Sequence, residues 1–176
     1  MKSLSFLLFI CAVSTASAED LSLGMLGWEK TQQGDHKGAI ELFQRCIAEG
    51  NLTQASLART YRNIGIALRR DGRPLEAVDS YEKSIQLKPD DVHMDYVNKG
   101  NAYSDALKYE EALAEYDKAQ AILPHYNEAY YNRGLVYERQ EKKEQAIEQF
   151  KLAYQHGLRS QLLYERFVAY GLLEDK

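Results

Sequence analysis

The sequence has few of the residues that usually build a metal, covalent or phosphate site. It has two cysteines in 176 residues, and its four histidines, His36, His93, His125 and His156, lie far apart in the chain. No two of them have the i, i+4 spacing and accompanying Glu that are typical of a zinc helix. A Gly-rich phosphate loop after a strand and a nucleophile-elbow motif are also lacking. The sequence therefore predicts no enzyme, no metal and no cofactor.

The sequence also lacks an excess of positive charge. It has 22 basic and 26 acidic residues, for a net charge of −4 with neutral histidine. A nucleic-acid-binding domain normally shows the opposite balance, so we expect no nucleic-acid partner. The length fits a single domain.

Long apolar stretches are missing except at the N-terminus. One Lys is followed by an apolar run over residues 4–13 and by the small residues Ala16, Ser17 and Ala18. This layout is typical of a secretory signal peptide cleaved after Ala18, and the run is too short to span a bilayer comfortably. We expect residues 1–18 to direct export and the mature chain to be periplasmic or secreted, without a membrane span. An uncleaved anchor is the alternative, and a cytoplasmic location would follow if this interpretation fails.

Only Cys46 remains after such processing. A cysteine in an oxidising compartment needs burial or a partner, and free cysteine packs as a small hydrophobe. Ser84, Ala119 and Ala153 occupy the corresponding slot elsewhere in the chain. Cys46 is therefore expected to be a small buried packing residue.

An internal repeat is the dominant feature of the chain. Gly27, Gly65, Gly100 and Gly134 lie 38, 35 and 34 residues apart. After each glycine, apolar residues recur at helical spacing, as in Ala112, Leu113 and Tyr116. A period in this range predicts stacked supersecondary units that each bury their apolar face against a neighbour.

The pattern resembles the tetratricopeptide repeat. The signature of that family is an aromatic residue, Leu-Gly, a Tyr, an Ala followed four residues later by an aromatic residue, and a Pro. The third copy matches it at Tyr96, Gly100, Tyr103, Ala112, Tyr116 and Pro124. The second and fourth copies follow the same pattern, and the first copy is the weakest because it has no Pro.

The resemblance implies an all-α, right-handed solenoid of four helix-turn-helix repeats. The expected repeats cover about residues 20–53, 58–91, 93–126 and 127–160, and a C-terminal capping helix is expected over about 161–173. Val168 occupies the glycine slot of that last helix. Glycine is needed where a second helix packs closely, so Val168 is tolerated if no second helix follows.

Three asparagines recur in one slot of the first helices, which by family resemblance face the concave side. They are Asn63, Asn98 and Asn132, and we call them the Asn ladder. An amide offers both donors and an acceptor, so such a ladder can bind the backbone of an extended peptide without reading its sequence. The alternative is that these amides bond neighbouring helices.

Four further residues of the first helices complete the predicted peptide-binding set. They are Arg59, Arg62, Asn101 and Tyr131. Because Arg pairs well with carboxylates, Arg62 is the expected contact for an acidic or C-terminal group of the ligand. The carboxylate clamp of chaperone-binding family members is not matched, because Ile66, Glu128 and Asn132 stand where it has Asn and two basic residues.

The predicted function is a non-catalytic adaptor or scaffold that binds an extended peptide or a partner helix in the concave groove. Self-assembly through the solenoid ends is an alternative, because exposed ends can stack. A further alternative is an accessory subunit of an enzyme or secretion complex.

Overall fold

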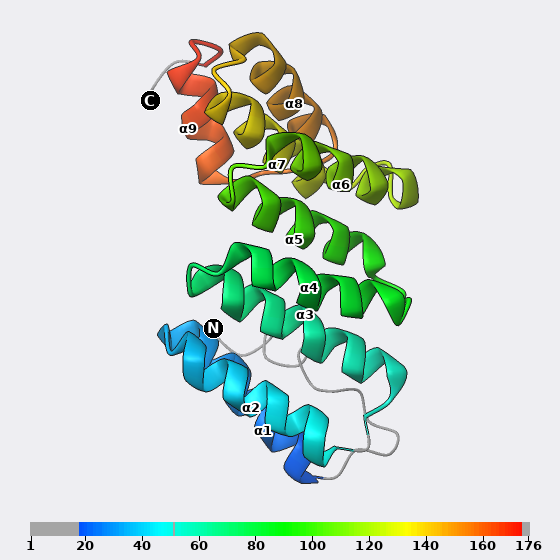
Figure 1. The fold of residues 1–176 in the computed structure, drawn as a ribbon. Coiled ribbons are helices and arrows are strands. Elements are labelled where there is room, and N and C mark those ends of the chain that lie inside the picture. The colour runs from blue at the N-terminus through cyan, green and yellow to red at the C-terminus, as the bar shows by residue number, and fades with distance from the viewer. Residues whose placement is uncertain (1–17, 51, 174–176) are drawn as a thin grey trace.

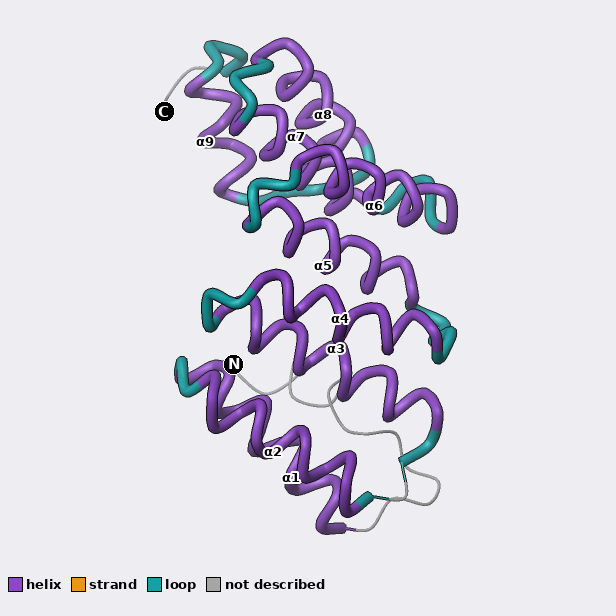
Figure 2. Tube along the Cα trace, in the orientation of Figure 1, coloured by secondary structure: helices purple, strands orange, loops and turns teal. Residues whose placement is uncertain are grey.

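The structure, a computed structural model, describes residues 18–50 and 52–173, which form nine helices and no strand. The helices are α1 (Ala18–Gln33), α2 (His36–Glu49), α3 (Gln54–Arg70), α4 (Pro74–Gln86), α5 (Val92–Asp105), α6 (Tyr109–Ile122), α7 (Asn127–Arg139), α8 (Lys143–Gln155) and α9 (Gln161–Ala169). They stack one after another, with α1 and α9 at opposite ends (Figures 1 and 2). The predicted all-α solenoid of helix pairs is confirmed.

The helices are paired by short turns that need a left-handed residue. Gly34 and Gly72 have φ of +85° and +78° in the first two turns, and Leu107 and Glu141 have φ of 61° and 60° in the next two. Glycine adopts this conformation without steric cost, whereas other L-residues are strained there. The third and fourth turns therefore carry a local cost that the first two avoid.

Within each pair the two helices meet at the repeating glycine. A Cβ atom added at Gly100 would lie 2.5 Å from Cε1 of Tyr116, which is much closer than carbon atoms can approach. The other three copies repeat this contact between glycine and ring: Gly27 with Phe43, Gly65 with Tyr81 and Gly134 with Phe150. The four rings are almost completely buried. The glycine period thus marks the points where a second helix lays its aromatic ring on the first helix.

The first glycine spacing, 38 residues, is longer than the later two, 35 and 34 residues, and the difference lies in α3. α3 is 17 residues long, whereas α5 has 14 and α7 has 13. Thr53 caps its start, because the Thr53 side chain accepts a hydrogen bond from the backbone N–H of Ser56. The additional residues therefore lengthen a helix rather than a loop.

The array curves toward its first helices. α3 contacts α5 and α5 contacts α7, whereas no successive second helices in the described part of the chain make contacts of that extent. First helices therefore lie closer together than second helices, which places them on the inner side of the curve. This surface, formed by α1, α3, α5, α7 and α9, is the concave surface.

α9 closes the C-terminal end. Leu163 and Phe167 of α9 are buried against Phe150 of α8, and Val168 is only partly buried. The capping helix ends at Ala169 rather than near residue 173, because the chain turns at Gly171, where φ is +69°. At the other end, Cys46 is buried beside Leu23, as its predicted packing role requires.

Candidate peptide-binding surface

The Asn ladder lies on three consecutive first helices. Asn63 is on α3, Asn98 on α5 and Asn132 on α7, and each is partly buried. In the described part of the chain no hydrogen bond occupies any of the three amides. The alternative that these amides bond neighbouring helices therefore has no contact to support it.

A polar pocket of about 180 Å³ opens on the concave surface beside the ladder. We call it the concave pocket, and its lining residues are Arg69, Asn101, Ser104, Asp105, Tyr116, Asn132, Leu135 and Arg139. Asn98 lies three residues before Asn101 on α5, so helical spacing puts it on the same face. Of the predicted site residues, the structure brings Asn101 and Asn132 together in this pocket.

Asp105 bridges the two arginines of the concave pocket. Its Oδ2 lies 2.8 Å from Nη1 of Arg69 on α3, and its Oδ1 lies 3.4 Å from Nη1 of Arg139 on α7. The same Nη1 of Arg139 donates to Oγ of Ser104 at 2.6 Å. Burial lowers the pKa of Arg69, but its interactions with Asp105 and Tyr81 together outweigh this effect and raise the pKa overall. Three successive repeats are therefore tied together at the base of the pocket.

Asn101 is held in place from the second helix of its own repeat. The hydroxyl of Tyr116 donates to Oδ1 of Asn101 at 2.8 Å. This bond takes up the amide oxygen, and Nδ2 of Asn101 makes no hydrogen bond with the described residues. Burial raises the pKa of Tyr116, so its hydroxyl stays protonated at neutral pH and can donate this hydrogen bond.

Arg62 has a different environment from the one we expected. Its side chain is only 8% exposed, and its guanidinium binds both Asp91, at 2.6 Å, and the fully buried Asp95, at 2.7 Å. The predicted acceptor of an acidic ligand is thus already engaged by two carboxylates of the next repeat. The reason is the position of Arg62 on α3, which directs its side chain toward α5, the following first helix, rather than into the groove. Hydrogen bonds from Arg62 lower the pKa of Asp91, whereas burial raises the pKa of Asp95 despite the same arginine.

Tyr131 occupies the corresponding slot in the fourth repeat. Its ring packs 5.6 Å from that of Phe150, and the guanidinium of Arg166 on α9 lies 5.7 Å from its centroid. Tyr131 therefore joins the last repeat to the capping helix. Arg59 is partly buried near Asp91, and its Nη2 has no hydrogen-bond partner among the described residues.

Two cations that replace the apolar residue before the repeating glycine hold the later repeats together. Lys99 lies 2.8 Å from Glu82 of α4 and 3.3 Å from Glu115 of α6. Arg133 on α7 pairs with Asp117 of α6. These two residues were assigned no role from the sequence. The signal that could have identified them is a basic residue in a slot that is apolar in the other copies.

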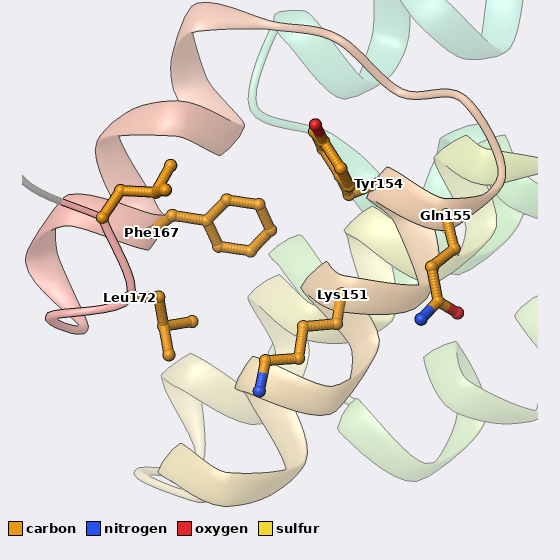
Figure 3. A pocket seen from close by; sticks show the side chains of 6 residues that line it. Lys151, Tyr154, Gln155, Phe167 and Leu172 are labelled. Atoms are coloured by element: carbon orange, nitrogen blue, oxygen red, sulfur yellow. The ribbon is translucent and has the colours of Figure 1, made fainter.

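A second, apolar pocket lies at the C-terminal end, where Figure 3 shows Tyr154, Phe167 and Leu172 around it. Leu173 and the stem of Lys151 also line this pocket, which has a volume of about 280 Å³. Tyr154 is 46% exposed and Leu173 is also 46% exposed. No second helix covers this side of α9 within residues 18–50 and 52–173, so apolar side chains of the pocket are in contact with solvent there.

The structure places two of the scattered histidines together. His125 and His156 have ring centroids 4.9 Å apart, and Tyr130 stacks on His156 at 4.9 Å. Over residues 18–50 and 52–173, no group of three or more His, Cys, Asp or Glu side chains is placed to hold a metal ion. No helix in that same part has the length and apolar character needed to cross a membrane.

The geometry defines an α-solenoid of helix-turn-helix repeats with a polar concave surface. Comparison with known families assigns the repeats. Tetratricopeptide repeat models match residues 31–90 and 128–155, and a further TPR repeat model matches residues 100–141. The chain therefore carries tetratricopeptide repeats, as the resemblance implied.

Solved structures with the same architecture include several TPR proteins. The crystal structure of MamA is 25% identical, with a TM-score of 0.64, over 78% of this chain and 77% of that one. YrrB, described as a TPR protein with an unusual peptide-binding site, is 17% identical with a TM-score of 0.66 over 84% of this chain and 73% of that one. The second TPR domain of Spaghetti, solved bound to an HSP90 peptide, is 21% identical with a TM-score of 0.52 over 59% of this chain and 90% of that one. The last two likenesses show the fold alone.

A curated relative is the protein O-mannosyl-transferase Tmtc3 of Drosophila melanogaster. It is 30% identical over 67 residues, which are 38% of this chain and 7% of the relative. The chain thus spans a small part of the length of that relative.

Proposed function

We propose that this chain is a non-catalytic adaptor that binds an extended peptide or a partner helix on its concave surface. The observation that carries the proposal is the Asn ladder, three amides in register on consecutive first helices without a bond to the described residues. Two TPR proteins with the same fold are described as peptide-binding or were solved with a peptide bound, which supports this use of the fold.

The register of the ladder fits recognition of a peptide backbone. An extended chain presents N–H and C=O groups along its length, and each amide can donate to one and accept from the other. Asn101 adds a further donor, on the same helix as Asn98 and in the same pocket lining as Asn132. The rigid helices fix these groups before the ligand arrives, which limits the entropy lost on binding.

The test replaces all three asparagines of the ladder with alanine. Backbone hydrogen bonds are worth about 0.5 to 1.5 kcal/mol each, so affinity for a partner captured with the mature chain should fall by about one to three powers of ten. The matched control replaces three exposed amides of the second helices, Gln44, Gln86 and Gln145, with alanine and should bind normally. Unchanged affinity in a ladder variant that keeps its helical circular dichroism spectrum would exclude the concave surface.

We also propose that the chain is exported through its N-terminal segment. Residues 1–17 lie outside the described part, so this proposal rests on the sequence pattern before Ala18. Mass spectrometry of the protein from its native host should find a chain that begins at Glu19. A soluble product that retains Met1 would contradict export with cleavage.

Association through the C-terminal end is the second candidate, favoured by the apolar pocket around Phe167 and Leu173. If copies stack there, Leu173→Glu should abolish any concentration-dependent mass seen by light scattering. A monomeric wild type at all concentrations would exclude this candidate and leave the peptide-binding proposal unaffected.

A further inference from the structure

We propose that the concave pocket receives a carboxylate of the bound ligand, either an acidic side chain or a C-terminus. This inference rests on the proposed function, because it assigns one ligand group to a place on the same surface. It moves the acidic contact from the buried Arg62 to Arg69 and Arg139.

The charge of the pocket favours an anion. Arg69 and Arg139 contribute two positive charges to its lining, and Asp105 contributes one negative charge. The lining therefore carries one positive charge more than its own carboxylate can neutralise. The side chains of Arg69 and Asp105 are 27% and 33% exposed, so part of this charge is shielded from water.

The unbonded polar groups of the pocket favour a ligand group that accepts hydrogen bonds. Most of its acceptors are already engaged, because Oδ1 of Asn101 accepts from the Tyr116 hydroxyl and Asp105 accepts from both arginines, which leaves Oδ1 of Asn132 as the unbonded amide acceptor. Unbonded donors outnumber it: Nδ2 of Asn101, Nδ2 of Asn132 and Nη2 of Arg139 make no hydrogen bond with the described residues. A carboxylate offers only acceptors when ionised, so it complements this set, whereas a ligand amine would be repelled.

The size and place of the pocket fit a single small group. Its volume of about 180 Å³ is large enough for a carboxylate with one or two carbons but too small for a folded element. Asn132 belongs both to the ladder and to the pocket lining. A peptide held by the ladder would therefore pass directly beside the pocket.

Asp105 gives this inference a test that loss of folding cannot imitate. In the free protein, its carboxylate occupies the two arginines that a ligand carboxylate would use. The substitution Asp105→Asn removes this competing charge and keeps the size of the side chain. We expect carboxylate binding to become several-fold tighter, whereas an unfolded variant would bind more weakly.

The experiment titrates three synthetic probes into the isotope-labelled mature chain and follows side-chain NMR signals of Arg139, Asn101 and Asn132. The first probe is acetyl-Gly-Ser-Glu-Ser-Gly-amide, and the second has Gln in place of Glu. The third is the Gln peptide with a free C-terminal carboxylate. One or both carboxylate probes should bind about tenfold or more tightly than the neutral peptide, with shifts at these three side chains and weaker binding at high ionic strength. The comparison of the first and third probes identifies the source of the carboxylate.

The variants complete the test. Arg139→Gln should remove the preference for carboxylate, whereas Arg45→Gln, an exposed arginine on α2, should leave it unchanged. Equal affinity for the neutral and carboxylate probes, or no tightening in Asp105→Asn, would overturn the inference. Either result would leave the proposed function of the Asn ladder untouched. Binding of the neutral peptide and of the captured partner still measures backbone recognition by the ladder.

Discussion

At the scale of single residues, the buried arginine of α3 shows how the repeats are joined. Arg62 spans from α3 to Asp91 and Asp95 at the start of the next repeat, and the carboxylate of Asp95 has no exposure to solvent. A buried charge pair costs desolvation energy on both sides, and the loss of one partner leaves the other uncompensated. Arg62 therefore acts on stability and on the register between repeats.

Replacement of Arg62 by Met should destabilise the chain by about 3 to 5 kcal/mol, because it leaves Asp95 buried without a counter-charge. The control Arg45→Met, at an exposed pair on α2, should change stability by less than about 1 kcal/mol. Urea denaturation measures both variants. Equal stability of wild type and Arg62→Met would show that the ion pair is not formed.

The same variant has a pH dependence of defined sign. Burial already raises the pKa of Asp95, and removal of Arg62 should raise it further. A raised folded-state pKa means that the folded chain binds the proton more tightly than the unfolded chain does. The stability deficit of Arg62→Met should therefore shrink as pH falls through the folded-state pKa of Asp95, and be smallest below the unfolded value of about 4. A deficit that grows on acidification would contradict this assignment.

At the scale of elements, the glycine and the ring define the crossing of each helix pair. Tyr116 lies so close to Gly100 that any side chain at position 100 would displace the ring. α9 carries Val168 in the same slot, and no second helix follows it in the described part of the chain. The same position in the repeat thus has two different steric requirements, which depend only on whether a partner helix is present.

Gly100→Leu should destabilise the chain by about 1 to 3 kcal/mol through overpacking, partly offset by roughly 1 kcal/mol of better helix propensity. Val168→Leu, in the matching slot of α9, should cost much less because that slot already holds a side chain that is only partly buried. Thermal melts followed by circular dichroism compare the two. A Gly100→Leu protein that melts like wild type would contradict the close crossing.

At the scale of the whole molecule, the described helices make their extensive contacts within a repeat or with the neighbouring repeat, so the helices at the two ends of the array matter for its stability. α9 covers Phe150 of the last complete repeat with Leu163 and Phe167, and Arg166 ties it to Glu138 of α7 at 3.0 Å. Terminal repeats of such arrays need a covering element, because each unit buries its apolar face only against the next.

Deletion of residues 160–176 should lower the melting temperature by more than about 2 to 4 °C, the shift expected from 1 kcal/mol in a chain of this length. The reason is the exposure of Phe150 and its neighbours to water. Leu162→Gln, at an α9 position that is 56% exposed, serves as the control and should melt close to wild type. A truncated chain as stable as the control would show that α9 is not a cap.

The sequence by itself determined the periodic part of this protein. The spacing of Gly27, Gly65, Gly100 and Gly134 and the helical apolar stripes predicted the pairs, their crossings and the capping helix, because those features arise from contacts that recur in every copy. It also identified the Asn ladder, whose three members recur in one slot of the first helices, and Asn101, which belongs to one copy alone.

Only the tertiary structure decided which charged side chains are available to a ligand. Arg62 and Arg69 lie on the same helix, yet one is buried against the next repeat and the other lines the concave pocket. Their difference depends on where the following helix places Asp95 and Asp105, and the pattern within one copy does not contain that information. Contacts between repeats depend on the angle and offset of stacking, so the side chains at the joints can be assigned only when the whole array is in place.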